Sequence, residues 1–245
     1  GLPLQTPARF RQTLALVQEL RPDRFSLFSF AYLPEQLPLQ RKIAAADLPS
    51  PRDRLVMLEE ANQQLTANGY EAIGMDHYAL VGDRLAEAAR RGALHRNFQG
   101  YSTQPDCDLL ALGVSSIGRM GATYHQNAKT LDEYYDALDH DRFPVVRGLA
   151  LSRDDLVRRA VIMALMCQGQ VMFEEINQAY LIDFKRYFAR EWDTLAELED
   201  DGLVSTDTQG VMVTPKGRFL VRAIAMVFDR YVQADLDRSR FSKII

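Results

Sequence analysis

The sequence predicts an α/β fold over residues 1–148, followed by a mainly helical, winged-helix-like domain over residues 149–245. In the first part, helix-type and strand-type patterns alternate, which is typical of α/β units. In the second part, strand patterns nearly stop, and helices with one short two-stranded hairpin remain.

Two helices of the first part open in the same way, with a hydroxyl side chain followed by proline. Thr6-Pro7 and Ser50-Pro51 supply an N-cap and a first helical residue. The elements expected here are a helix over 6–20, a strand over 24–31, a loop over 32–49, a helix over 50–68 and a strand over 70–75. Strand, helix and strand in this order predict two parallel strands.

The middle of the chain predicts a short helix, a hairpin, a further helix and a linker. Thr130 and Glu133 have the spacing of a capping box, so a helix is expected to begin there. The other ranges are 83–91 for the short helix, 108–116 and 123–127 for the hairpin, and 140–148 for the linker.

The last part opens on a second capping box, formed by Ser152 and Asp155. Behind it, Leu156, Ala160 and Met163 form an apolar stripe at helical spacing. The elements expected next are helices over 173–180 and 184–199, a hairpin of 202–205 with 210–213, and a final helix over 216–231. Helices followed by a two-stranded wing are typical of a winged-helix domain.

The composition argues against several classes of partner. With 47% apolar and 25% charged residues, the chain resembles a soluble globular protein. The net charge of −4 and the lack of a basic tract predict no nucleic-acid partner and no membrane partner. No apolar run reaches the roughly 18 residues that cross a bilayer, and no signal-peptide pattern opens the chain. We therefore expect a cytoplasmic protein.

The sequence predicts no metal site built from this chain alone. Cys107 and Cys167 lie far apart, and no two of the four histidines have metal-ligand spacing. The neighbours Asp76 and His77 would point in different directions in an extended strand, although a polar supporting role at the end of that strand is open to them.

Residues 95–118 are the segment best suited to contact a ligand. Gly100 and Gly113 allow the backbone to turn or to approach another group closely. Gln99, Tyr101 and Ser102 supply hydrogen-bonding groups. The alternative is a loop that leads into a hairpin, with polar side chains satisfying the backbone.

Several strings make the chain similar to a known family. They include residues 95–118, Gly74-Met75-Asp76-His77-Tyr78, Phe28-Ser29-Phe30-Ala31-Tyr32-Leu33-Pro34, and Asp200-Asp201-Gly202-Leu203-Val204 with Thr214-Pro215-Lys216-Gly217-Arg218. With them the sequence resembles the oxygen-independent coproporphyrinogen III oxidases, radical S-adenosylmethionine enzymes of haem biosynthesis. The resemblance covers nearly the whole chain and is far more specific than a single short motif.

The resemblance implies a particular architecture. Residues 1–148 would be the C-terminal part of a partial (β/α)6 radical-SAM barrel with a β extension, and residues 149–245 the winged-helix-like domain. The family's C-x3-C-x2-C motif, which binds a [4Fe–4S] cluster, lies upstream of the segment that Gly1-Leu2-Pro3 matches. We therefore expect this chain to be the C-terminal part of the enzyme, to lack the cluster ligands, to need the missing N-terminal half as a partner, and to be inactive alone.

The resemblance also implies a reaction and a set of site residues. The family uses two S-adenosylmethionine molecules and a 5′-deoxyadenosyl radical to convert the ring A and B propionates of coproporphyrinogen III to vinyl groups, giving protoporphyrinogen IX. By this resemblance Gln99 is a catalytic candidate, and Ala31 and Ile117 contact S-adenosylmethionine. Arg96 would bind a substrate propionate, because guanidinium groups pair well with carboxylates.

Other interpretations remain open at this stage. Ala31 and Ile117 could simply pack in a core, Gln99 could cap a loop, and Arg96 could be a solvated surface cation. A haem chaperone of the same superfamily is the nearest alternative function. A winged-helix DNA-binding protein is less favoured, because the helix in the recognition position ends in the acidic run 197–201.

Overall fold

The structure is a computed structural model that describes residues 1–105 and 107–235. Its first sheet has the strand order β1–β3–β2, with β1 at Arg24–Ser26, β2 at Tyr70–Gly74 and β3 at His77–Leu80. Helices α1 (Pro7–Glu19) and α2 (Pro51–Ala67) pack on one face, and α3 (Arg84–Arg90) packs on the other. The three helices agree with the predicted ranges, and the caps of α1 and α2 are the predicted Thr6 and Ser50 hydroxyls.

The two strands predicted to be parallel, β1 and β2, do run in the same direction in one sheet. They do not pair with each other, because β3, which was not predicted, lies between them and is antiparallel to both. The chain reverses directly after Gly74, where Met75 adopts a φ of 40°. The strand expected over 24–31 is also shorter, because β1 ends at Ser26. The loop that follows β1 contains the 3-10 turns η1 (Pro38–Lys42) and η2 (Ala45–Asp47).

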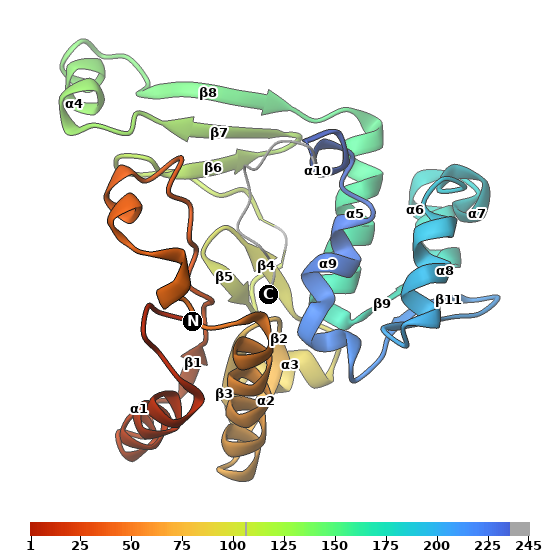
Figure 1. Ribbon diagram of the computed structural model, residues 1–245. Helices are drawn as coiled ribbons and strands as arrows, with labels where there is room; N and C mark the ends of the chain where they lie inside the picture. Colours follow the sequence, from red (N-terminus) through yellow and green to blue (C-terminus); the bar gives the residue numbers. More distant parts are fainter. Residues whose placement is uncertain (106, 236–245) are drawn as a thin grey trace.

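The middle of the chain forms a hairpin and a second sheet. The hairpin pairs β4 (His95–Asn97) with β5 (Gly100–Ser102). The sheet has the order β6–β7–β8, with β6 at Ile117–Met120, β7 at Thr123–Asn127 and β8 at Val145–Ala150. Helix α4 (Leu131–Asp139) connects β7 to β8 and lies at the far end of this extended sheet (Figure 1).

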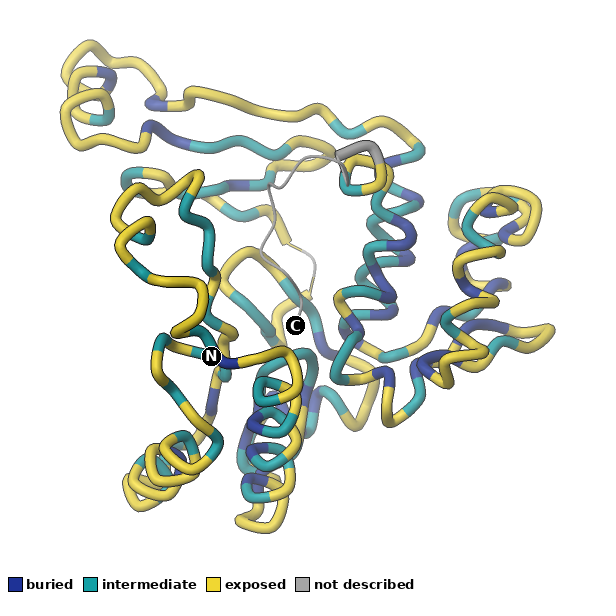
Figure 2. The backbone as a smooth tube through the Cα atoms, in the orientation of Figure 1, coloured by how far each residue is buried: buried dark blue, intermediate teal, exposed yellow. Residues whose placement is uncertain are grey.

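Two expectations for this region were wrong. Residues 108–116 form only an isolated bridge between Leu109 and Arg119, because Gly113 (φ 93°) and Ser115 (φ 56°) interrupt any extended run. The predicted linker over 140–148 contains the start of β8, which is exposed along its whole length (Figure 2). Such a strand has no buried face, so its sequence need not alternate between apolar and polar residues and does not predict a strand.

The C-terminal part begins with α5 (Arg153–Gln168), which has the predicted capping box and ends at Gly169 in the left-handed region. The elements that follow are β9 (Gln170–Met172), α6 (Phe173–Tyr180), α7 (Phe184–Tyr187), α8 (Trp192–Asp200), β10 (Val204–Thr206), β11 (Gly210–Val213), η3 (Gly217–Leu220), α9 (Val221–Met226) and α10 (Arg230–Asp235). The predicted β10–β11 hairpin is confirmed, and β9 adds a third strand to it.

Two long helices expected here are interrupted. The helix predicted over 184–199 breaks into α7 and α8, because the chain leaves helical geometry at Phe188 and buries that ring fully against Phe184 and Phe228. The helix predicted over 216–231 breaks into η3, α9 and α10. Asp229 supplies the new cap for α10 by accepting from the backbone N–H groups of Tyr231 and Val232.

Helix α5 connects two hydrophobic cores. Its fully buried residues Val157, Val161 and Leu165 belong to the C-terminal core. Cys167, two residues after Leu165 and therefore on another face of the helix, packs instead with α3 and the first sheet. None of the described helices is long and apolar enough to span a membrane.

Gly217, in the turn η3 that follows the β10–β11 hairpin, packs directly against the hairpin and yields a stability prediction. A Cβ at this position would overlap the carbonyl oxygen of Leu203, and backbone cannot move as freely as the end of a side chain. Gly217→Ala should therefore lower the free energy of unfolding by roughly 2–3 kcal/mol. Gly82→Ala is the control, because Gly82 meets nothing within 4 Å and should change stability by less than about 0.5 kcal/mol. Equal urea midpoints for the two variants would contradict the packing argument.

Candidate functional site

A cavity of about 1450 Å³ lies between the β4–β5 hairpin, the β6–β7–β8 sheet, α5 and residues 228–229, the segment that enters α10. Its wall gathers cationic side chains from all of these elements, namely Arg96, Arg119, Arg147, Arg158, Arg159 and Arg230. The described acidic residues of the wall are Asp108, Asp155 and Asp229. Cations therefore outnumber anions in the described wall, which favours anionic ligands.

Arg96 lies on the β4 side of the cavity and is half-buried. Its guanidinium lies over the ring of Tyr101, 4.8 Å from the ring centroid, and the Tyr101 hydroxyl donates to the carbonyl of Met166 at 2.8 Å. Burial raises the pKa of Tyr101, so this phenol remains a hydrogen-bond donor at neutral pH. Nη1 of Arg96 is buried and has no hydrogen-bond partner among the described residues. Because an unpaired buried donor is costly, this atom is well suited to a ligand carboxylate.

Gln99 lies in the turn between β4 and β5 and also lines the cavity. The turn is held by its backbone N–H, which donates to Oδ1 of Asn97 at 2.9 Å. Gly100 closes the turn with a φ of 131°, a conformation that favours glycine. The backbone of Gln99 is thus fixed by the hairpin, and its exposed amide is positioned at the cavity.

Ile117, the first residue of β6, is half-buried in the same wall. Ala31 is placed elsewhere. It is exposed in the loop after β1, where its carbonyl accepts from Nε2 of Gln40 at 2.9 Å, and it does not line the cavity. The structure therefore brings together Arg96, Gln99 and Ile117 and leaves Ala31 outside the cavity.

Asp76 and His77 do not point apart, as an extended strand would require. The chain turns after Gly74, and His77 Nδ1 lies 2.7 Å from Oδ1 of Asp76. The His77 ring packs edge-on against Tyr101, with 5.2 Å between centroids. This pair supports the back of the hairpin and is absent from the cavity wall.

Sequence reasoning missed several residues of the wall. Tyr124, His125 and Gln126 of β7 all line the cavity. Period-two alternation in the predicted strand 123–127 could have indicated that Tyr124 and Gln126 share a face. Tyr124 accepts from Nε of Arg159 on α5 at 2.8 Å, which joins the sheet to the helix. Arg147 was missed because its segment was predicted to be a linker.

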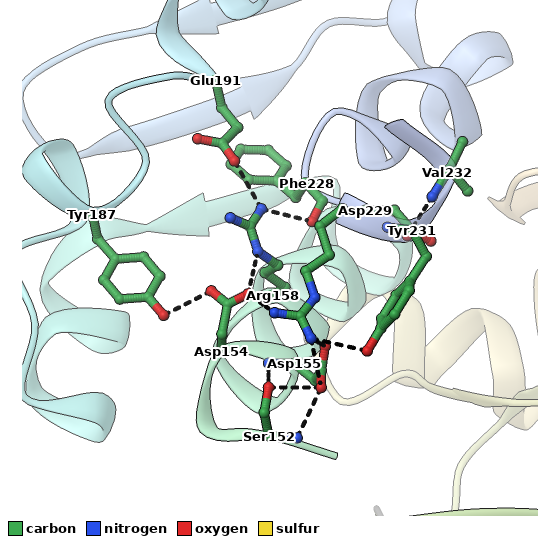
Figure 3. A network of polar contacts seen from close by, with 11 residues as sticks. Ser152, Asp154, Asp155, Arg158, Tyr187, Glu191, Phe228, Asp229, Tyr231 and Val232 are labelled. Atoms are coloured by element: carbon green, nitrogen blue, oxygen red, sulfur yellow. Dashed lines mark hydrogen bonds and ion pairs between the residues drawn. The ribbon is translucent and has the colours of Figure 1, made fainter. Parts of the chain in front are cut away.

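A network of ion pairs holds the rim of the cavity (Figure 3). Arg158 donates to Asp154 at 2.9 Å, to Glu191 at 2.7 Å and to the carbonyl of Phe228 at 3.1 Å. Arg230 contacts Asp154 at 2.9 Å and Asp155 at 3.1 Å. The network ties the segment that enters α10 to the first turn of α5.

The two aspartates of this network are held in their charged form. Burial raises the pKa of Asp154, but hydrogen bonds from Tyr187 and Arg158 outweigh it, so the pKa lies below its ordinary value. Burial also raises the pKa of Asp155. Hydrogen bonds from Ser152 and the charge of Arg230 again lower the pKa overall.

The cysteines form no metal site. Cys107 is exposed on the loop before β6, whereas Cys167 is buried on α5, where burial raises the pKa of its thiol to about 11. Within residues 1–105 and 107–235, no group of three His, Cys, Asp or Glu side chains could hold a metal ion. The described residues therefore do not fit an iron–sulfur cluster.

The rim network predicts a specific acid sensitivity. Carboxyl groups whose pKa is lower in the folded chain stabilise the fold above their unfolded pKa of about 3.9, and this stabilisation is lost as the pH falls through the folded pKa. The unfolding free energy should therefore drop as the pH falls below about 4, toward the lowered pKa values of Asp154 and Asp155. In Asp154→Asn this drop should be smaller, as measured by urea titration at each pH.

Asp136→Asn is the matched control, because Asp136 pairs with Arg142 on the surface, with both side chains about 60% exposed. Its pH profile should follow that of the unmodified protein. If Asp154→Asn also followed that profile, the rim network would not be the source of the acid sensitivity.

Comparisons with known proteins place this chain in a family. Residues 151–220 match the family described as the HemN C-terminal domain. Over 245 residues the chain is 48% identical to the oxygen-independent coproporphyrinogen III oxidases of Pseudomonas aeruginosa and Escherichia coli, covering 100% of itself and 53% and 54% of those proteins. The chain thus spans about half the length of these relatives. It is 43% identical over 246 residues to the oxygen-independent coproporphyrinogen III oxidase of Thermostichus vulcanus, of which it covers 75%.

A solved structure agrees with these similarities. It is titled "Coproporphyrinogen III oxidase (HemN) from Escherichia coli is a Radical SAM enzyme" and matches with a TM-score of 0.89 at 50% identity, over 94% of this chain and 53% of that one. The match confirms the α/β class and the expected likeness to part of a radical-SAM fold with a C-terminal domain. The chain belongs to the oxygen-independent coproporphyrinogen III oxidase family.

Proposed function

We propose that the whole protein converts the ring A and B propionates of coproporphyrinogen III to vinyl groups without oxygen, giving protoporphyrinogen IX. This chain contributes one wall of the active site and the C-terminal part of the fold. The observation that carries the proposal is the cationic cavity, whose wall includes Gln99, Ile117 and the unpartnered Nη1 of Arg96. The named relatives support the same reaction.

The chemistry of the cavity suits this substrate. Coproporphyrinogen III carries four propionates on a macrocycle that is apolar apart from its pyrrole N–H groups. Guanidinium groups bind carboxylates with two parallel hydrogen bonds, and Arg96 is held for this purpose by its contact with Tyr101. The role of Arg96 is to bind and orient one propionate.

The proposal includes two S-adenosylmethionine molecules and a [4Fe–4S] cluster. When bound, they supply the 5′-deoxyadenosyl radical that removes a hydrogen atom from the propionate, after which carbon dioxide and one electron leave. Ile117 would pack against one S-adenosylmethionine from the cavity wall, and Ala31 would contact the second from outside this cavity. The cluster ligands would come from the N-terminal half, because the described residues do not fit a cluster.

Gln99 is proposed to orient a reacting group. Its amide can donate and accept hydrogen bonds, but it has no useful pKa, so it does not act as a general base. The hairpin turn fixes its backbone, which limits the amide to the adjacent part of the cavity.

The N-terminal half is the proposed partner, and a cytoplasmic location is part of the proposal. In the first sheet both β1 and β2 are edge strands, and such strands can pair with further backbone. We propose that residues 1–148 and 149–245 act as two units. The separate C-terminal core, whose described buried residues all lie within 157–228, supports this division.

The family membership favours the oxidase over the haem chaperone. A DNA-binding role gains no support, because the helix before the wing, α8, carries Glu197, Glu199 and Asp200 in its last two turns and would repel phosphates.

The first test concerns Gln99 and Ile117 in the full-length protein. Gln99→Ala and Ile117→Gln should each reduce vinyl formation at least about tenfold. Gln99→Ala removes a hydrogen bond to a reacting ligand, and Ile117→Gln disturbs a packing contact with one. The measurement is anaerobic turnover followed by chromatography of the oxidised porphyrins. Gln63→Ala, on the exposed face of α2, is the control and should retain full activity. Normal turnover by both site variants would show that the cavity is not the active site.

A second test uses the 245-residue chain by itself. After anaerobic reconstitution it should contain no cluster and should produce no 5′-deoxyadenosine from S-adenosylmethionine, since Cys107 and Cys167 lie on separate elements. Iron and sulfide analysis with product chromatography are the measurements. About four irons per chain would refute the assignment of the cluster ligands to the N-terminal half.

A further inference from the structure

Three side chains form a row across the β6–β7–β8 sheet. Ile117 on β6 is the cross-strand partner of Gln126 on β7, and Gln126 is the partner of Arg147 on β8. Directly opposed residues lie about 5 Å apart and point to the same face of a sheet. All three line the cavity. The row therefore presents an apolar group, an amide and a cation in sequence along one wall.

The amide of Gln126 has a fixed orientation and an unused acceptor. Its Nε2 donates to the carbonyl of Ser115 at 2.9 Å, which identifies the other amide atom as the oxygen. That oxygen, Oε1, is buried and has no partner among the described residues. A buried amide oxygen without a donor is unfavourable, so the site is built to accept a hydrogen bond from a ligand N–H or O–H group.

Arg147 differs from Arg158 and Arg230, the arginines of the rim network, in having no carboxylate partner among the described residues. Arg158 and Arg230 are paired with carboxylates of α5 and with Glu191, which precedes α8. Arg147 is exposed on β8, and no carboxylate of the described residues pairs with it. Its guanidinium is thus available to an anion that enters the cavity next to Gln126.

Gln126 and Arg147 together match a ligand that carries a hydrogen-bond donor and a carboxylate a short distance apart. A pyrrole ring with a propionate side chain has this pattern, because its N–H group and its carboxylate are separated by two ring carbons and two methylene groups. The unpartnered Nη1 of Arg96, in the β4 side of the cavity, offers a second carboxylate site.

We propose that Gln126 and Arg147 form a subsite for one propionate-bearing pyrrole ring of the tetrapyrrole substrate. Gln126 Oε1 accepts from the pyrrole N–H, and Arg147 pairs with the propionate of the same ring. Ile117, next in the row, lies against the cofactor side of the ring. This assignment rests on the proposed function and adds two substrate-binding residues to it.

The test uses the full-length holoenzyme and measures two affinities separately. Coproporphyrinogen III binding is measured under anaerobic conditions without S-adenosylmethionine, and S-adenosylmethionine binding is measured without the tetrapyrrole. Gln126→Leu and Arg147→Met should each weaken coproporphyrinogen III binding roughly ten- to hundredfold, with S-adenosylmethionine affinity unchanged. Arg147→Lys, which retains the charge but not the bidentate geometry, should recover part of the loss.

Two matched controls separate the subsite from general effects of these substitutions. Gln178→Leu removes an amide on α6 that donates to Glu174 away from the cavity, and Arg142→Met removes a cation at the α4 end of the same sheet. Both should bind coproporphyrinogen III normally. Because Arg147 is exposed, its replacement tests binding without disturbing a packed core.

The outcomes distinguish this inference from the proposed function. Unchanged coproporphyrinogen III affinity in Gln126→Leu and Arg147→Met would overturn the subsite while the enzyme still forms vinyl groups. Loss of S-adenosylmethionine affinity instead would assign the row to the cofactor and also overturn the subsite. If the unmodified holoenzyme neither bound nor converted coproporphyrinogen III, the proposed function itself would fail.

Discussion

The burial of α5 between two hydrophobic cores determines where the cavity can form. Val157, Val161 and Leu165 are fully buried in the C-terminal core, while Cys167 packs with α3 and the first sheet. A helix fixed from both sides in this way cannot rotate without exposing a large apolar area. Its remaining face, which carries Arg158 and Arg159, is therefore directed to the cavity.

Polar contacts then attach the other walls to this helix. The Tyr101 hydroxyl bonds to the Met166 carbonyl and secures the β4–β5 hairpin. The Tyr124 hydroxyl accepts from Arg159 and secures the sheet. The rim network holds the segment that enters α10. Each wall thus takes its position from a different point along α5, which explains how elements distant in sequence share one site.

The cavity wall contains two buried polar atoms that have neither a hydrogen-bond nor an ion-pair partner among the described residues, and Gln18 and Thr206 carry such atoms outside the cavity. Buried polar atoms in proteins almost always have partners, yet Arg96 Nη1 and Gln126 Oε1 have none among the described residues. One is a donor with positive charge and the other is a neutral acceptor. Both atoms lie in the wall of a cavity that is large enough for a ligand, so a ligand can supply the missing hydrogen-bond partners. The ion pairs at the rim are different, because their groups satisfy one another and serve to hold the chain.

The sequence alone determined most helices, since their signals are local. Hydroxyl caps, proline at the first turn and capping boxes act within four residues, and α1, α2, α4 and α5 begin where these signals stand. The family resemblance also rested on short stretches of consecutive residues, and it singled out Arg96, Gln99 and Ile117 as site residues. Strand pairing was not local. β3 inserts between β1 and β2 because of a turn at Met75, and β8 has no buried face that a pattern could mark. Only the tertiary structure placed Gln126 and Arg147 beside Ile117, because cross-strand register depends on contacts between residues far apart in the chain.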